Sequence, residues 1–141
     1  MSVGTIYLED LHIGMSRSIT KAITFDMIEK FGDVSEDRNP IHFDEEAGKA
    51  SIFGDRVAHG MLSASLFSAL LGERLPGHGT IYVSQPLRFM GPVKIGDEVT
   101  ATVTVSDMMP ERKRVTLTCE AKVDEKLVIT GEAMVLAPSR S

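Results

Sequence analysis

Apolar and polar residues alternate along two stretches in the second half of the chain. Between positions 99 and 105, valine and alanine alternate with threonine, and apolar residues alternate with polar ones in the same way between 115 and 123. A period of two residues is typical of antiparallel strands that bury one face of a sheet. Residues 80–89 and 126–137 are two further strand candidates. Two connecting segments are predicted to be turns: 91–98 because of its glycines and proline, and 109–114 because of its charged residues.

One segment, MLSASLFSALLGERL at residues 61–75, is apolar or small on nearly every side until its last turn. A helix that is apolar all round must be buried all round. About fifteen residues at ~1.5 Å rise per residue span only ~22 Å, which is too short to cross a membrane. We therefore predict a core helix wrapped by the antiparallel strands, in a single α+β domain over residues 1–141.

The first half contains a predicted amphipathic helix that begins at Phe25, with Thr24 as its N-cap and Asp26 near its positive end. Its apolar residues recur at helical spacing and predict one buried face: Met27, Ile28, Phe31 and Val34. Pro40 ends any helical continuation, and the residue before a proline is pushed toward an extended conformation. A short acidic helix is predicted to follow over residues 44–50.

The charge balance and the single cysteine narrow the possible functions. A net charge of −5 argues against nucleic acid as a partner, although a local basic patch could still bind a phosphate-bearing ligand. Cys119 cannot form an internal disulfide, and its alternating surroundings indicate a buried small apolar residue. No Cys/His cluster has the spacing of a metal site. No stretch approaches the ~20 apolar residues of a membrane span and the first residues lack a secretory signal, so we expect no membrane partner and a cytoplasmic location.

The segment SEDRNPIH places a carboxylate, Asp37, and an imidazole, His42, five positions apart. On a helix these positions would diverge, but Pro40 forbids that geometry, and an extended turn would point both side chains into one cleft. A carboxylate raises the pKa of a neighbouring imidazole and burial lowers it, so such a pair can transfer protons in both directions near neutral pH. Asn39 offers an amide that can pin the turn or hold a water. The alternative is that Asp37 caps a turn and His42 is a structural histidine, because short motifs often match by chance.

Gly60 is predicted at the N-terminus of the core helix, directly after His59. Free N–H groups and the helix dipole make such a position an anion site, and a glycine lets a ligand approach the backbone. A thioester carbonyl placed there would gain negative charge during enolate formation, which fixed donors favour. Close packing of the helix is the alternative for Gly60, and we interpret His59 as a capping or solvent-facing residue.

These segments resemble the MaoC-like (R)-specific enoyl-CoA hydratases, which have a hot-dog fold. The resemblance rests on motifs that occur in the family's order along almost the whole chain: DRNPIH at 37–42 with Ala47 beyond it, VAHGML at 57–62, LPGHGTIY at 75–82, VKIGDEV at 93–99 and TGEA at 130–133. It implies a curved antiparallel sheet wrapped around one buried central helix. It further implies that Asp37 and His42 are the catalytic dyad and that Gly60 donates its N–H to the thioester.

The same resemblance implies the substrate and the assembly. The substrate would be a trans-2-enoyl-CoA, hydrated reversibly by syn addition, with no metal and no cofactor because coenzyme A is part of the substrate. The chain would be a homodimer whose sheets join edge to edge. Ser68, Leu71 and Val135 correspond to positions that shape the acyl pocket, although a plain core role is equally compatible with Leu71. The chain departs from the family at Glu36, where many members carry glycine, and this puts the pH optimum in doubt.

Two other functions remain open on this fold. An acyl-CoA thioesterase would activate water with a carboxylate to attack the carbonyl, and it needs no histidine paired through an N-P-x-H turn. A non-catalytic acyl-CoA-binding domain is the second alternative, because a fold does not determine a function. The presence of both proton carriers argues against a binding domain.

Overall fold

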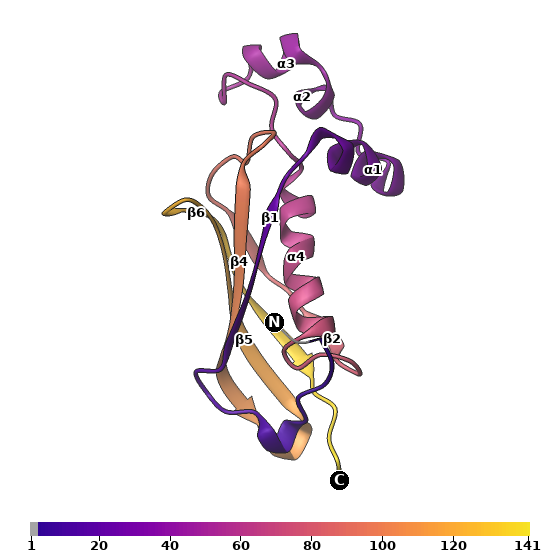
Figure 1. Ribbon diagram of the computed structural model, residues 1–141, viewed down its shortest axis with the longest axis vertical. Coiled ribbons are helices and arrows are strands. Elements are labelled where there is room, and N and C mark those ends of the chain that lie inside the picture. The colour runs from indigo at the N-terminus through magenta and orange to yellow at the C-terminus, as the bar shows by residue number, and fades with distance from the viewer. Residues whose placement is uncertain (1–2) are drawn as a thin grey trace.

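A six-stranded antiparallel sheet curves around one long helix, α4 (Gly60–Glu73), in the computed structural model, which describes residues 3–141 (Figure 1). The strands are β1 (Ser16–Ala22), β2 (Ile81–Ser84), β3 (Leu87–Phe89), β4 (Glu98–Met109), β5 (Arg114–Val123) and β6 (Lys126–Leu136). The shorter helices are α1 (Phe25–Ser35), α2 (Pro40–Phe43) and α3 (Glu45–Ala50), with 3-10 turns η1 (Leu8–Asp10) and η2 (Pro110–Arg112). The predicted α+β class and hot-dog arrangement are confirmed.

The strand order is β1-β4-β5-β6-β2, and β3 also pairs with β6. Every pairing is antiparallel, and Val103 of β4 lies opposite Cys119 of β5, which lies opposite Gly131 of β6. The alternating residues expected to face inward on β4 and β5 are buried, Cys119 among them, except Val123 at the end of β5, which is partly buried. The period of two residues therefore predicted the correct face of the sheet.

The helix α4 packs its apolar side against this sheet, but it is not buried all round. Phe67 and Leu70 are fully buried, whereas four positions spaced as one face of a helix are exposed: Met61, Ser65, Ser68 and Gly72. The prediction of complete burial was wrong for this stripe, because the sheet wraps only part of the helix circumference. The small serine and glycine residues hid the stripe from a reading of hydrophobicity.

The N-cap of α1 is confirmed, since the Thr24 side chain accepts a hydrogen bond from the Met27 N–H at 3.2 Å. The predicted apolar face is only partly buried, and Val34 is 81% exposed. Ile28 and Gly32 define the buried side of the helix. Val34 lies six residues beyond Ile28, which turns it about 240° around the helix at ~100° per residue. The short acidic helix predicted over residues 44–50 is present as α3, and the Asp44 side chain caps it by accepting the Glu46 N–H.

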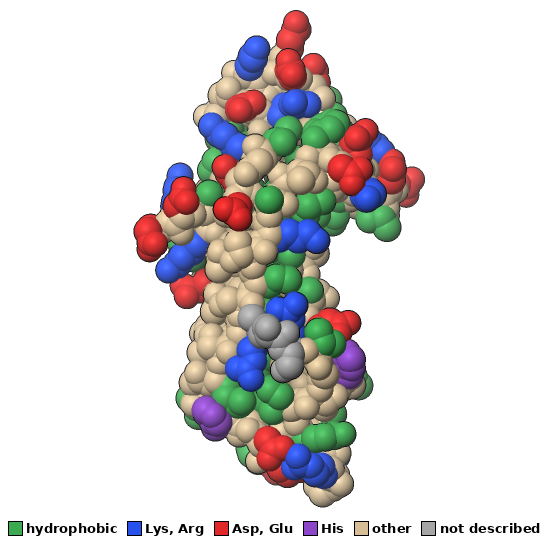
Figure 2. All heavy atoms as spheres, in the orientation of Figure 1, with side chains coloured by type: hydrophobic (Ala, Val, Ile, Leu, Met, Phe, Trp, Pro, Cys, Tyr) green, Lys and Arg blue, Asp and Glu red, His purple; other side chains and the backbone are tan. Residues whose placement is uncertain are grey.

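The helices α1 to α3 gather at one end of the elongated sheet, above the N-terminal end of α4 (Figure 1). Acidic and basic side chains intermingle over this end of the molecule, with apolar side chains between them (Figure 2). Among the described residues, no helix is both long and apolar enough to cross a membrane. The segment that carries Asp37 and His42 therefore lies where α1 to α3 meet the start of the central helix.

Candidate active site

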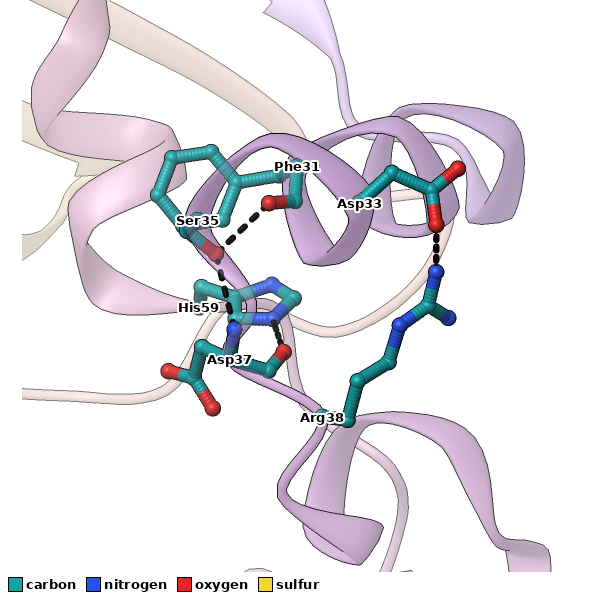
Figure 3. A network of polar contacts seen from close by, with 6 residues as sticks. All are labelled: Phe31, Asp33, Ser35, Asp37, Arg38 and His59. Atoms are coloured by element: carbon teal, nitrogen blue, oxygen red, sulfur yellow. Dashed lines mark hydrogen bonds and ion pairs between the residues drawn. The ribbon is translucent and has the colours of Figure 1, made fainter.

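The chain turns sharply after α1, and side-chain oxygens hold this turn. Glu36 adopts the left-handed conformation, with φ of 65°. The Ser35 hydroxyl donates to the Phe31 carbonyl at 2.6 Å and accepts the Asp37 N–H at 3.1 Å. The Asp37 carboxylate in turn accepts the N–H of Asn39 at 3.2 Å. These contacts bend the backbone so that Asp37 lies next to His59, the N-cap residue of α4 (Figure 3).

Pro40 begins a helix in this structure, which corrects one expectation. We predicted an extended turn from Asp37 to His42, but Pro40 stands at the first position of α2. A proline fits there because its missing N–H would have no partner within the helix. Asn39 is the N-cap, and its side-chain oxygen accepts the Ile41 N–H at 3.2 Å. His42 therefore sits on one tight helical turn.

His42 is 9% exposed, and a backbone carbonyl fixes its tautomer. The distance from His42 Nδ1 to the Val57 carbonyl oxygen is 2.7 Å. A carbonyl can only accept, so Nδ1 carries the proton and Nε2 of the neutral ring keeps a free lone pair. Val57 is itself held by its N–H, which donates to the Ile41 carbonyl at 3.3 Å. The ring is therefore oriented by a backbone carbonyl whose own residue is held by the backbone of α2.

His59 is 2% exposed, so the expectation that it faces solvent was wrong. It stands at the N-cap position of α4, but its side chain makes no capping hydrogen bond. Its Nε2 donates to the backbone carbonyl of Asp37 at 2.9 Å (Figure 3). Its ring stacks on His42, with centroids 4.0 Å apart and planes inclined by 32°. Burial lowers the pKa of His59 from its usual 6.5, and the hydrogen bond to Asp37 offsets this only in part. No local pattern in the sequence indicates this contact, because it depends on how the turn before α2 folds back over the start of α4.

Asp37, His42 and His59 each offer one potential metal-ligand atom, and these atoms lie within 4.8 Å of one another. Two imidazoles and a carboxylate are donors that zinc accepts. One nitrogen of each imidazole already donates to a backbone carbonyl, which leaves one free lone pair on each ring. Such a lone pair can accept a proton or a metal ion, so the absence of a metal stays a prediction.

A cavity of about 330 Å³ opens beside His42. Its wall is mostly apolar, with polar groups from three side chains: Asn39, His42 and Ser63. Gly60 also lines it, in the first turn of α4, where backbone N–H groups have no acceptor within the helix. A Cβ at Gly60 would lie 2.6 Å from ring carbons of Phe89. Gly60 is thus a glycine because an aromatic ring lies against its backbone, and its N–H is placed at the cavity wall.

A second cavity of about 450 Å³ lies between α4 and the strands β2 and β3. Ser68 lines it, and Met61 lines both cavities. Leu71 and Val135, the other two predicted acyl-pocket residues, are 1% and 0% exposed and belong to the hydrophobic core. The structure therefore places Asn39, His42 and Gly60 on one cavity, with Asp37 next to His42, and sets Ser68 on the neighbouring cavity.

Ser63 is a further polar residue of the site that the sequence analysis missed. It is fully buried, its hydroxyl has no hydrogen-bond partner among the described residues, and it lines the first cavity. The available signal was its position three residues after Gly60, which places both on the same face of a helix. The small size of serine within an apolar helix concealed it.

A model of the family described as MaoC like domain matches residues 12–127. The chain is 50% identical over 134 residues to the (R)-specific enoyl-CoA hydratase of Rhodospirillum rubrum, covering 95% of this chain and 93% of that protein. It is 43% identical over 135 residues to the 3-hydroxybutyryl-CoA dehydratase of Methylorubrum extorquens, covering 96% and 86%.

Solved structures agree with these sequence matches. The (R)-hydratase of Aeromonas caviae superposes with a TM-score of 0.89 at 40% identity, covering 92% of this chain and 99% of that one. An R-hydratase of Pseudomonas aeruginosa superposes with a TM-score of 0.90 at 38% identity, covering 96% and 88%. By family model, sequence identity and structure alike, this chain belongs to the MaoC-like domain family.

Proposed function

We propose that this protein is an (R)-specific enoyl-CoA hydratase, which adds water reversibly to trans-2-enoyl-CoA to give (R)-3-hydroxyacyl-CoA. The observation that carries the proposal has two parts: a carboxylate oxygen of Asp37 lies within 4.8 Å of a ring nitrogen of His42, and His42 lines the cavity whose wall includes Gly60. One place then offers two proton carriers and a backbone N–H at a helix N-terminus. Relatives at 50% and 43% identity are named as a hydratase and a dehydratase, which are the two directions of one reaction.

In the proposed mechanism, Asp37 and His42 bracket one water molecule. The tautomer fixed by Val57 leaves His42 Nε2 free to accept a proton or, once protonated, to donate one. The hydroxyl of the water bonds to C3, and one of the pair returns a proton to C2 on the same face. The Gly60 N–H stabilises the negative charge that develops on the thioester oxygen between these events. The hydroxyl and the proton of one water molecule both end up in the product, so the substrate is neither oxidised nor reduced overall. The reaction therefore needs no redox cofactor, and we propose that the enzyme uses none.

A direct assay distinguishes this reaction from its alternatives. Crotonyl-CoA should lose its enoyl absorbance, and coupling to separate (R)- and (S)-specific 3-hydroxyacyl-CoA dehydrogenases should detect only the (R) product. Release of free coenzyme A thiol without hydration would instead assign an acyl-CoA thioesterase. Binding of the thioester with neither reaction would leave an acyl-CoA-binding domain.

We propose further that two copies of the chain join through the β2 edge of the sheet. β2 pairs with β6 on one side only, and its residues Ile81, Tyr82 and Val83 are exposed. Monomeric proteins rarely leave a strand edge open beside apolar residues. Light scattering should give twice the chain mass of 15.4 kDa. A monomer mass at micromolar concentration would contradict the dimer.

The acyl chain is proposed to run along α4, past Ser68, Leu71 and Val135. Ser68 supports this path because it lines the second cavity, which shares Met61 with the first. Leu71 and Val135 lie one layer deeper, so they would act by setting the volume behind the cavity wall. A cytoplasmic location, where acyl-CoA thioesters would be available, stays part of the proposal.

A further inference from the structure

His59 is a buried titratable residue to which the proposed mechanism gives no step. It touches both residues of the proposed dyad, but by different means. Its Nε2–H donates to the backbone carbonyl of Asp37 at 2.9 Å, and its ring lies on the ring of His42 at 4.0 Å. The aromatic rings of Phe31 and Phe43 enclose it, with centroids 4.8 Å and 5.7 Å away.

This arrangement determines the protonation state of His59. Nε2 carries a proton because the Asp37 carbonyl can only accept. Nδ1 is buried and has no hydrogen-bond partner among the described residues. A proton there would create a buried and unpaired charge, which is strongly unfavourable. The ring is therefore held as a neutral donor, and it does not compete with His42 for the protons of the reaction.

We propose that His59 is a positioning residue that fixes the Asp37 backbone and the His42 ring relative to each other. Asp37 is exposed and stands on a turn outside any helix, and its bonds to Ser35 and Asn39 hold it only within that turn. His59 begins the most deeply buried helix and supplies a restraint from the rigid part of the molecule. Proton transfer to one shared water requires both groups within hydrogen-bond reach at once, so a shift of about 1 Å lowers the rate about 100-fold.

A purely structural role would have different consequences. A buried histidine that only fills space would lower stability when replaced, and its effect on turnover would be the same whether or not Asp37 is functional. A positioning residue loses its effect when the carboxylate that it positions is removed, because residues that act as one unit are not additive. The proposal rests on the proposed hydratase activity.

The test is a double-mutant cycle on crotonyl-CoA hydration, with His59→Phe and Asp37→Asn alone and together. His59→Phe keeps an aromatic ring for the stack and removes the donor to Asp37. It should lower kcat about 10- to 100-fold with KM changed less than about threefold. In the Asp37→Asn background the same change should lower kcat less than about threefold. His59→Gln keeps an N–H donor and should retain more activity than His59→Phe.

Exposed His12 provides the matched control, because its side chain bonds only the adjacent Ile13 carbonyl among the described residues, and His12→Gln should leave kcat unchanged. Normal kcat in His59→Phe, or an equal fall in both backgrounds, would overturn the positioning role. If His59→Phe does not fold, His59→Leu, which also removes the donor to the Asp37 carbonyl, carries the same cycle. Absence of hydration by the wild-type enzyme would overturn the proposed function instead, so the two failures are distinguishable.

Discussion

Replacing Gly60 with alanine separates the two reasons for a glycine at the start of α4. The added Cβ would lie 2.6 Å from Cδ1 and Cε1 of the Phe89 ring, so the ring must move. Phe89 is 50% exposed and can rotate toward solvent. We expect the overpacking penalty at the low end of its range, about 1 kcal/mol. The higher helix propensity of alanine offsets up to about 1 kcal/mol of it. The net change in the free energy of unfolding should therefore stay below about 1 kcal/mol.

Catalysis should suffer far more than stability in Gly60→Ala. The methyl group and the displaced Phe89 ring would both stand at the cavity wall where the thioester oxygen must reach the Gly60 N–H. Removal of one donor to a developing oxyanion lowers kcat about 100- to 1,000-fold in other enzymes. The comparison requires kcat on crotonyl-CoA together with a thermal melt followed by circular dichroism.

Gly72 offers a control within the same helix. A Cβ there meets nothing within 4 Å, so Gly72→Ala should keep normal turnover and gain up to about 1 kcal/mol in the free energy of unfolding. If Gly60→Ala melts early but turns over normally at temperatures where it is folded, then Gly60 serves packing alone, and the placement of the thioester on its N–H is wrong.

Four further predictions concern the same region. Asp37→Asn and His42→Gln should each lower kcat at least ~100-fold in steady-state kinetics without unfolding the protein, and the double variant should be little worse than either. Near-normal turnover in either single variant would remove that residue from the mechanism. Leu71→Ala should shift preference toward longer enoyl chains by at most ~1–3 kcal/mol in kcat/KM, and an unchanged chain-length profile would mean that the tail runs elsewhere. Glu36→Gly should raise the free energy of unfolding by about 0.5–1 kcal/mol in a urea titration, because glycine relieves the left-handed conformation at φ of 65° at some entropic cost. Since burial lowers the pKa of His59, the unfolded chain binds more protons below pH 6.5, so the melting temperature of the wild type should fall more steeply on acidification than that of His59→Phe.

The sequence predicted the layers of the fold because burial leaves a periodic trace. The alternation on β4 and β5 and the N-cap Thr24 each express a local rule, and each was confirmed. The exposed stripe on α4 was not predicted, because serine and glycine are compatible with either environment. The predicted burial of Val34 was wrong for a related reason. Helical spacing shows which side of a helix is apolar, but not how much of that side the rest of the protein covers.

The sequence identified a residue of the candidate site only where its type and its spacing from other residues suggested a chemical role. Asp37, His42 and Gly60 attracted attention by their type and spacing, and the structure brings them together. His59 and Ser63 depend on contacts across the fold, which no local pattern encodes. The role of Glu36 could be seen only from its backbone angle, which shows why glycine suits this position: the position requires a positive φ.

The two stacked imidazoles each donate a hydrogen bond to a main-chain carbonyl: His42 to that of Val57, and His59 to that of Asp37. A side-chain substitution does not remove a main-chain carbonyl. The tautomer of each ring should therefore be retained when the side chain at Val57 or Asp37 is replaced. The vulnerable changes are those that redirect the main chain, such as an insertion in the turn after α1 or between α3 and α4. The loop lengths on either side of α2 and α3 therefore constrain how this protein can evolve or be engineered, in addition to the side chains of Ser35, Asp37 and Asn39 that hold the first of these loops.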